Sequence, residues 1–362
     1  MNLHQGTNLM RKTAIFKNDL FLEHKPGQTH VESPRRLEVI HERLAAPEII
    51  KTFHFPAFGP ASREILQMNH TPAHINRVAS TAGKPFDSLD PDTMTSARSY
   101  DAACLAAGAV VEGTRLLTAG EIDNCFALVR PPGHHAEAGR GMGFCLFNNI
   151  AIGANYAIRE LKLDRIMIVD WDLHHGNGTQ HSFYNTNQVL YFSTHQYPYY
   201  PGTGSLSEIG EGKGEGFTIN VPLPGGQDDF SFASIFNDIL SPIARQYKPD
   251  LIMISAGFDI YIADPLGGMA VTEKGFAYMT RVLQDLSDEI CGGRLLATLE
   301  GGYDLNGLRD GIMASLSEMA GTSILDDETA GAFKNTHIDN QDGVFASILE
   351  QIRNIAKNYW TL

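Results

Sequence analysis

The sequence predicts an α/β fold with a mainly parallel central sheet, and three observations carry that prediction. Short apolar runs with many β-branched and aromatic residues recur along the chain. These runs are continuous rather than alternating, which is typical of strands that are covered on both faces. Segments with apolar residues at helical spacing lie between them, so strand and helix alternate, as they do in α/β proteins.

The predicted strands are the short apolar runs, each of which ends at polar residues or at Gly and Pro. In chain order they cover residues 13–16, 124–129, 165–170, 188–193, 217–221, 250–255 and 294–300. Helices are predicted from the segments with helical spacing, which cover residues 99–117, 147–161, 275–290 and 343–360. In the last of these, Val344, Ile348, Ile352 and Ile355 form an apolar stripe that predicts packing against the core.

A single domain over residues 1–362 is expected, because no internal repeat or low-complexity linker divides the chain. The length exceeds that of a usual single core, but large α/β enzymes often exceed it as one domain. The Gly-rich segment 201–217 does not follow the strand–GxGxxG–helix order of a phosphate-binding loop. It is predicted to be an ordered surface loop that can line a site.

Composition describes an ordinary globular protein, with 43% hydrophobic and 19% charged residues. The net charge of −14 disfavours nucleic acid and anionic membranes as partners, since both require a basic face. The N-terminus has no signal-peptide pattern and no apolar run is long enough to span a bilayer, so a cytoplasmic location is expected. Four scattered cysteines without C-x-x-C spacing predict buried, reduced thiols; they are Cys104, Cys125, Cys145 and Cys291.

Four of the predicted strands are followed at once by an unusual group of polar residues. The four groups begin with "RPPGHHAEAGRGMGF", "DWDLHHGNGT", "AGFDIYIADPLGG" and "EGGYDL". In open parallel sheets, ligands bind at the carboxyl ends of the strands. Four polar groups at the same end of a sheet predict one composite site.

The second group contains the side chains of a predicted metal site. Asp170, Asp172 and His174 alternate, so they face one side if the chain stays extended. Carboxylate oxygen and imidazole nitrogen are normal ligands of Zn²⁺ and similar divalent ions. Asp259, just after its own strand, is the best candidate for a further ligand, although a helix N-cap or turn acid is the alternative. Asp264, before Pro265, fits a turn.

Acid–base groups are predicted next to this metal site. His134 and His135 follow a rigid "RPPG" turn, and histidine titrates near neutrality. Asp170 could hold one of the two imidazoles by a hydrogen bond. Tyr303 lies in "GGY", where its phenol could donate to a substrate carbonyl; a packed core tyrosine is the alternative. These parts predict a metal-assisted hydrolase, and no G-x-S-x-G motif supports a covalent mechanism.

With these residues in view, the chain resembles the histone deacetylase superfamily, which includes acetylpolyamine amidohydrolases and acetoin-utilisation proteins. The resemblance runs from "HVESPRRL" at residue 30, through "LDPDT", "RPPGHHA", "GFCLFNN", "DWDLHHGNGT", "PGTG" and "SAGFD", to "LEGGYDL" at residue 305. It is strongest with the class II branch and its bacterial relatives. The fold that it implies is a single three-layer arginase-like domain with an eight-stranded, mainly parallel sheet.

The resemblance also implies a role for each polar group of the site. Zinc, for which Fe²⁺ is an alternative, would be bound by Asp172, His174 and Asp259. His135 would be the general base that deprotonates the attacking water and later protonates the leaving amine. His134 would be the second, electrostatic histidine, paired with Asp170, which supports a histidine instead of binding zinc. Tyr303 would polarise the acyl carbonyl.

Two further sets of residues follow from the resemblance. The substrate tunnel would be formed by the aromatic walls Phe144 and Tyr200, by Gly143, and by a rim acid at Asp92 or, with less support, Asp90. A structural K⁺ would be bound by main-chain carbonyls of Asp170, Asp172, His174 and Thr194 and by the side chains of Asp172 and Ser193. Asn177, opposite the base, stands where class I members have aspartate. The class II branch also has asparagine at this position.

The expected substrate is an acyl-lysine in a protein or peptide, and the expected enzyme is a hydroxamate-sensitive deacetylase. Polyamine-selective relatives place a glutamate seven residues after the last zinc aspartate, where this chain has Leu266. An apolar rim suits a neutral acyl-lysine stem better than a second ammonium, but an acetylated polyamine stays open as the substrate. A binuclear manganese ureohydrolase and a non-catalytic acyl-lysine reader also stay open as functions, and a homo-oligomer stays open as the assembly.

Overall fold

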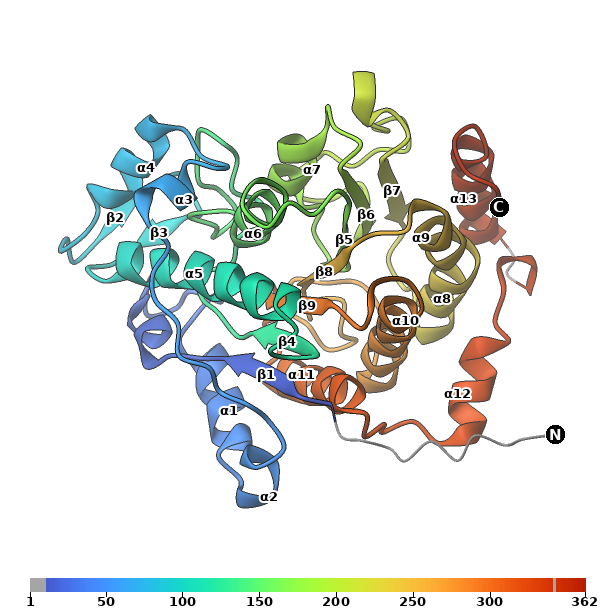
Figure 1. Cartoon of the computed structure of the whole chain (residues 1–362), viewed down its shortest axis with the longest axis horizontal. Coiled ribbons are helices and arrows are strands. Elements are labelled where there is room, and N and C mark those ends of the chain that lie inside the picture. Colours follow the sequence, from blue (N-terminus) through green and yellow to red (C-terminus); the bar gives the residue numbers. More distant parts are fainter. Residues whose placement is uncertain (1–10, 341–342) are drawn as a thin grey trace.

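The computed structural model describes residues 11–340 and 343–362 (Figure 1). Its centre is a parallel sheet of seven strands in the order β1-β4-β9-β8-β5-β6-β7. The strands are β1 (Thr13–Phe16), β4 (Asn124–Ala127), β5 (Ile166–Asp170), β6 (Val189–Gln196), β7 (Thr218–Leu223), β8 (Leu251–Ala256) and β9 (Leu295–Leu299). All seven apolar runs therefore form strands, which confirms the predicted fold class.

The sheet has one strand fewer than the eight that the family resemblance implies. Beside the outer strand β1, the chain makes a single parallel bridge between Ala14 and His54. The Ile15 amide donates to the His54 carbonyl at 2.7 Å, and the His54 amide donates to the Thr13 carbonyl at 2.9 Å. Pro56 follows two residues later and has no amide hydrogen to continue the ladder, so the eighth strand is reduced to this bridge.

Helices cover both faces of the sheet, which gives three layers. Figure 1 shows α5, α6 and α7 on one side and α8, α10 and α11 on the other. The helical elements are η1 (Asp19–Glu23), α1 (Arg35–Leu44), α2 (Pro47–Ile50), α3 (Arg63–Leu66), α4 (Pro72–Ala79), α5 (Ser99–Thr118), α6 (Asn149–Arg159), α7 (Asn177–Phe183), η2 (Gly212–Gly214), α8 (Asp229–Ile235), η3 (Phe236–Leu240), α9 (Ser241–Tyr247), α10 (Glu273–Cys291), α11 (Leu305–Ala320), α12 (Asp327–Lys334), η4 (Ile338–Asn340) and α13 (Gly343–Ala356). A two-stranded hairpin, β2 (Asp87–Ser88) and β3 (Met94–Thr95), lies apart from the sheet.

Side-chain caps fix where the helices beside the site begin. The Asn148 side chain accepts from the Ala151 amide at 3.0 Å at the start of α6. The Asp304 side chain accepts from the Gly307 amide at 2.7 Å at the start of α11. Asn and Asp are strong N-caps because their oxygens satisfy amides that have no partner within the helix. Both caps follow the polar groups that come after strand ends, so they fix the loops that carry those groups.

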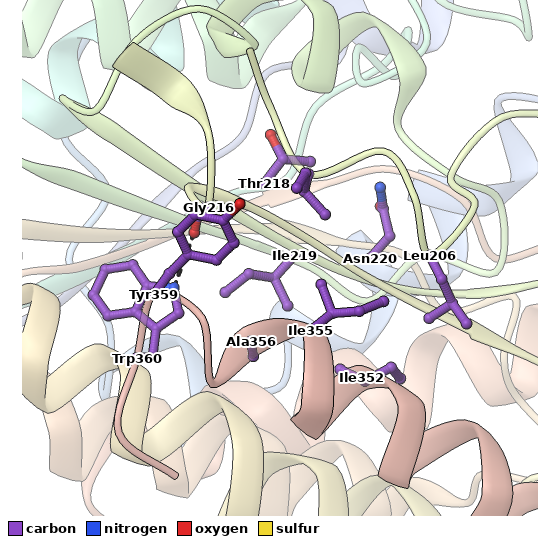
Figure 2. A pocket seen from close by; sticks show the side chains of 11 residues that line it. Leu206, Gly216, Thr218, Ile219, Asn220, Ile352, Ile355, Ala356, Tyr359 and Trp360 are labelled. Carbon is purple, nitrogen blue, oxygen red and sulfur yellow. Dashed lines mark hydrogen bonds between the residues drawn. The ribbon is translucent and has the colours of Figure 1, made fainter. Parts of the chain in front are cut away.

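The C-terminal segment packs against the sheet edge formed by β7. In α13, Ile352 is buried as the apolar stripe predicts, whereas Val344 is 70% exposed, so the predicted core contact is wrong at that position. Val344 lies in the first turn of α13, before the helix reaches β7. Figure 2 shows a narrow apolar pocket between Ile352, Trp360 and the strand. None of its lining residues is charged, and it is a gap between packed side chains.

Three further predictions can be compared with the structure. All four cysteines are buried and free, as predicted. Within residues 11–340 and 343–362, no helix combines the length and the apolar character needed to cross a membrane. The Gly-rich segment 201–217 is mostly irregular and contains only the short turn η2, as predicted for a loop.

Candidate functional site

The four polar groups meet at one edge of the sheet, because β4, β9, β8 and β5 are direct neighbours in it. Their carboxyl ends carry His134 and His135 after β4, Glu300 to Tyr303 after β9, Asp259 after β8 and Asp172 after β5. A pocket opens there, with a cavity volume of about 190 Å³. The structure therefore brings residues of all four polar groups together at one edge of the sheet.

Asp172, His174 and Asp259 form the one group of three side chains, among the residues that the structure describes, whose geometry could hold a metal ion. Their ligand atoms all lie within 4.8 Å of one another. His174 Nδ1 is 3.2 Å from Asp172 Oδ1 and 3.1 Å from Asp259 Oδ2. Two carboxylates and one imidazole are a donor set for Zn²⁺ or Fe²⁺, and three ligands leave a coordination position open.

The burial of the two carboxylates favours the binding of a cation at this group. The Asp172 and Asp259 side chains are 1% and 0% exposed. Burial and the charge of Asp172 raise the pKa of Asp259 to about 7, because two adjacent buried carboxylates resist joint ionisation. Burial lowers the pKa of His174, but its hydrogen bonds to Asp172 and Asp259 outweigh burial and raise that pKa to about 9. A divalent cation would supply the missing positive charge.

Backbone groups hold the two carboxylates in position. The Leu173 amide donates to Asp259 Oδ1 at 2.9 Å, and the Gly301 amide donates to Asp172 Oδ2 at 2.8 Å. At Gly301, a Cβ atom would lie only 2.3 Å from Asp259 Oδ2 and 2.6 Å from Asp172 Oδ2. Glycine is therefore required there for the backbone to approach both acids.

Asp170 points away from the metal group and toward His134. Its Oδ2 is 3.1 Å from His134 Nδ1 and accepts from the Tyr191 hydroxyl at 3.0 Å. This agrees with a supporting role for Asp170 and not with the simple expectation that residues 170, 172 and 174 all face one ion. Burial lowers the pKa of His134, but the charges of Asp172 and Asp170 outweigh burial and raise that pKa to about 10. The two carboxylates therefore favour the cationic form of the His134 imidazole.

His135 has the opposite electrostatic environment, although it is the next residue. Burial and the positive charges of His134 and His174 lower its pKa well below the usual value, so it is neutral. Its Nδ1 is 2.8 Å from Asn177 Oδ1. The amide oxygen can only accept, so Nδ1 carries the hydrogen and Nε2 keeps its lone pair. The environments of the two adjacent histidines thus shift their pKa values in opposite directions.

Tyr303 lies in the wall of the same pocket. Its backbone amide donates to Asp264 Oδ2 at 2.6 Å, and the Arg36 guanidinium lies 5.0 Å from the centre of its ring. Burial raises the pKa of the phenol well above its usual value, so the hydroxyl remains protonated and can donate. Asp264 also accepts from the Leu266 amide at 2.9 Å, which fits its predicted turn role.

The residues that the resemblance implied for the substrate tunnel also line this pocket. Phe144 and Tyr200 face the pocket together with Gly143, Asp92 and Leu266. Gly143 has a φ of +57°, and a Cβ atom there would lie 2.4 Å from His135 Cδ2, so only glycine fits.

The two candidate rim acids have different places. Asp92 Oδ1 accepts from the Gly143 amide at 3.1 Å, so this carboxylate lies at the pocket rim. Asp90 Oδ1 accepts from the amides of Asp92 and Thr93 instead, at 3.1 and 2.8 Å. Asp90 therefore shapes the turn, and Asp92 is the acid that lines the pocket.

The residues implied for a K⁺ site also lie together. Asp170 pairs with Ser193 across β5 and β6, and Ser193 and Thr194 are buried. Within residues 11–340 and 343–362, the carbonyl oxygens of Asp172 and His174 accept no hydrogen bond from the protein. Free carbonyls beside a buried carboxylate are compatible with a monovalent cation.

Several residues of the site escaped sequence reasoning. Glu300 is fully buried and its Oε2 accepts from the Gly133 and His134 amides, at 2.7 and 3.1 Å. Tyr191 supports Asp170, Pro132 lines the pocket, and Glu137 contacts Asn177. Glu300 and Glu137 lie within the polar groups that follow the strands, so the sequence could have indicated that they belong to the site. Tyr191 lies inside a strand, where no sequence pattern indicates a role in the site.

Comparison with known proteins adds independent findings. The histone deacetylase domain family model matches residues 30–319. A probable deacetylase of Archaeoglobus fulgidus is 39% identical over 297 residues, which cover 82% of each chain. Histone deacetylase 18 of Arabidopsis thaliana is 37% identical over 361 residues, covering 94% of this chain and 52% of the relative. The chain thus spans about half the length of that plant relative.

A solved structure agrees with the sequence comparisons. The crystal structure of the HDA15 HD domain superposes with a TM-score of 0.86 at 35% identity, covering 97% of this chain and 95% of that one. The likeness covers nearly the whole chain, and the sequence identity is above the level at which only a fold is shared.

Proposed function

The chain belongs to the histone deacetylase family of amide hydrolases, and on that premise we propose that it is a zinc-dependent enzyme that removes acetyl or other acyl groups from the ε-amine of lysine. One observation carries the proposal: two buried carboxylates and an imidazole lie at the pocket that a neutral histidine, a charged histidine and a tyrosine also line. This set combines a metal site, a base and an oxyanion donor.

Zinc, or Fe²⁺ in its place, would be held by Asp172, His174 and Asp259 and would polarise the acyl carbonyl and acidify water. A structural K⁺ would be held by the carbonyls of Asp170, Asp172, His174 and Thr194, with the side chains of Asp172 and Ser193. Both ions would also relieve the repulsion among the buried carboxylates at this edge of the sheet.

The two histidines would divide the proton chemistry. Neutral His135, with Nε2 free, would accept a proton from the attacking water and later donate it to the leaving amine. Charged His134, held by Asp170, would stabilise negative charge that develops on the substrate. A divalent cation among the same carboxylates would offset part of the charge that raises the pKa of His134 and would make this histidine less firmly protonated.

Tyr303 and the pocket walls would position the substrate. The protonated phenol would donate to the acyl oxygen, and the contact of the half-buried ring with Arg36 would limit where the hydroxyl can point. Phe144 and Tyr200 would flank the apolar stem of an acyl-lysine, Gly143 would accept from its amide through the backbone carbonyl, and Asp92 would orient the substrate backbone.

The choice of an acyl-lysine over an acetylated polyamine rests on Leu266. This side chain lines the pocket, and its carbonyl accepts from the Tyr199 hydroxyl at 2.9 Å, which ties the rim together. An apolar rim offers no counter-charge to the second ammonium of a polyamine. We infer that peptide or protein lysine is preferred and that nucleic acid and membranes are not direct partners.

The central test measures rates on acetyl-lysine peptides and on acetylated polyamines side by side, together with the metal content of the purified protein. Hydrolysis of the peptide that depends on bound zinc and is blocked by a hydroxamate supports the proposal. Faster hydrolysis of acetylpolyamines would assign the chain to the second class, and hydrolysis of neither would remove the proposed activity.

Leu266→Glu tests the rim argument. The new carboxylate should shift the ratio of the two rates about tenfold toward acetylpolyamines, since one charge contact is worth about 1.4 kcal/mol in a partly exposed site. Ile262→Glu is the matched control, because Ile262 is 59% exposed and does not line the pocket. An unchanged ratio in Leu266→Glu would contradict the role of the rim.

A further inference from the structure

Glu137 places a carboxylate directly behind the amide that holds His135. The side chain is 16% exposed, and its Oε1 accepts from Asn177 Nδ2 at 2.6 Å. The two oxygens also contact His181 Nδ1 at 2.8 and 3.0 Å. The Glu137 backbone is fixed as well, because its carbonyl accepts from His70 Nδ1 at 3.0 Å. A chain of contacts thus joins Glu137, Asn177 and His135.

A carboxylate is decisive at this place because it can only accept hydrogen bonds. An asparagine amide has two ends, one that donates and one that accepts. Since Glu137 requires the NH₂ end of Asn177, the carbonyl end must face His135 Nδ1. An accepting oxygen at that position requires Nδ1 to carry the hydrogen, so His135 Nε2 retains a lone pair.

The reversed amide would give the opposite result. Its NH₂ group would face His135 Nδ1, which would then have to accept, and the hydrogen of the neutral ring would be on Nε2. A histidine in that tautomer cannot take a proton through Nε2. The other acceptors near Asn177 Nδ2 are weaker: the His135 carbonyl lies at 3.4 Å and Met142 Sδ at 3.5 Å.

We propose that Glu137 is a positioning residue that fixes the orientation of the Asn177 amide and thereby the tautomer of His135. This inference rests on the proposed role of His135 as general base. An aspartate at position 177 could accept from His135 Nδ1 with either oxygen. An asparagine has only one accepting oxygen, so a second residue has to fix which end of its amide faces the imidazole. The negative charge is moved one residue away and acts through the amide.

The kinetic test is a double-mutant cycle on the metal-loaded enzyme. Glu137→Leu removes the acceptor and should lower kcat about 10- to 100-fold, with KM little changed, as is usual when a partner behind a site residue is lost. Glu137→Gln keeps an accepting oxygen and should retain more activity than Glu137→Leu. In the Asn177→Asp background no amide needs orienting and two carboxylates face each other, so Glu137→Leu should leave kcat unchanged or raise it.

An equal loss of kcat from Glu137→Leu in both backgrounds would overturn the proposal, because a residue that merely packs would behave the same way in each. His181→Phe is the matched control for the other contact of Glu137, and it should leave kcat within about twofold of the wild type. A loss in His181→Phe as large as in Glu137→Leu would show that the pair with His181, and not the Asn177 amide, is what matters.

A second measurement separates this inference from the proposed function. Nitrogen-15 NMR of the metal-loaded protein, with His135 assigned by substitution, should show the hydrogen on Nδ1 in the wild type and a shift toward Nε2 in Glu137→Leu. A wild-type His135 with its hydrogen on Nε2 would overturn the tautomer argument whatever the activity. A fully active His135→Ala variant, in contrast, would refute the base role and leave the tautomer result untouched.

Discussion

Two clusters of buried charge lie side by side in this protein and differ in how their charges are satisfied. The arginine cluster consists of His24, Glu32, Arg36 and Arg130, and the carboxylate cluster of Asp170, Asp172, Asp259 and Glu300. In the arginine cluster, each guanidinium nitrogen donates to a protein oxygen, either of Glu32 or of a backbone carbonyl. The carboxylate cluster gathers like charges around His134 and His174.

The difference teaches how to distinguish buried charge that builds structure from buried charge that prepares a site. Burying an ion costs several kcal/mol unless partners compensate it. The arginine cluster contains its own compensation. In the carboxylate cluster the pKa of Glu300 is raised to about 7 by burial, with Asp170 adding to that effect, and Asp259 responds in the same way. His134 and His174 compensate these four acids only in part, which is compatible with a site that binds a cation.

Asp259→Asn should have the largest effect, because it removes one of three expected ligands and leaves the shape intact. We expect the zinc content and the activity to be lost, while the metal-free protein unfolds at the same or higher denaturant concentration, since one like charge is gone. Metal analysis and urea unfolding of both forms check this. Asp229→Asn, a half-buried carboxylate that contacts Thr272 away from the site, should keep its metal. Full metal content in Asp259→Asn would refute the assignment.

Glu32→Gln tests the arginine cluster in the same way. Removing the one carboxylate leaves Arg36 and Arg130 without their counter-ion, which should reduce the free energy of unfolding by about 3–5 kcal/mol. The metal content of the folded protein should stay unchanged. Glu38→Gln is the control, because Glu38 and Arg35 form an exposed pair worth at most about 1 kcal/mol. A loss in Glu32→Gln no larger than in this control would remove the distinction between the clusters.

Tyr303→Phe changes a residue between the two clusters, since its ring lies on Arg36 and it lines the same pocket as His134 and His174. The phenylalanine keeps the ring contact and loses the donor, so kcat should fall about 10²- to 10³-fold, as for other oxyanion donors, with unchanged stability and metal content. Tyr261→Phe, outside the pocket, should remain fully active. Near-normal turnover in Tyr303→Phe would refute the donor role.

Much of this arrangement could be predicted from local sequence. Strand ends place Asp172, His174 and Asp259 together because neighbouring parallel strands finish at one edge. All seven apolar runs form strands, and their continuous apolar character reflects a sheet that is covered on both faces. The prediction of an eighth strand came from the family resemblance alone. It is wrong because Pro56 interrupts the ladder of hydrogen bonds beside β1.

Other features depend on contacts that no local pattern contains. The arginine cluster joins Glu32 to Arg130, 98 positions along the chain, and its role requires knowing that both are fully buried. The orientation of Asn177 depends on Glu137, 40 positions earlier. Val344 repeats the apolar spacing of α13 but is exposed, because periodicity indicates a face of the helix and not how far the partner surface extends.

The effect that is smallest at neutral pH concerns a buried group that carries no charge at all. Burial lowers the pKa of His70 from 6.5 to about 3, with a smaller contribution from His74. The neutral ring connects the Glu137 carbonyl to the Asn148 amide, through Nδ1 at 3.0 Å and Nε2 at 2.9 Å. Neutral burial is thus a third way to avoid an unpaired ion.

The pH dependence follows from proton binding. Below pH 6.5 the unfolded chain binds a proton at residue 70 that the folded protein excludes, so stability falls as the pH drops toward 3. His70→Gln should reduce this loss by about 1.4 kcal/mol per pH unit within that window. Urea unfolding at several pH values measures it, and above about pH 7.5, where His70 is neutral in both the folded and the unfolded state, the two curves should run parallel. Equal slopes below about pH 6 would mean that His70 binds its proton in the folded protein too, and that burial alone does not keep this ring neutral.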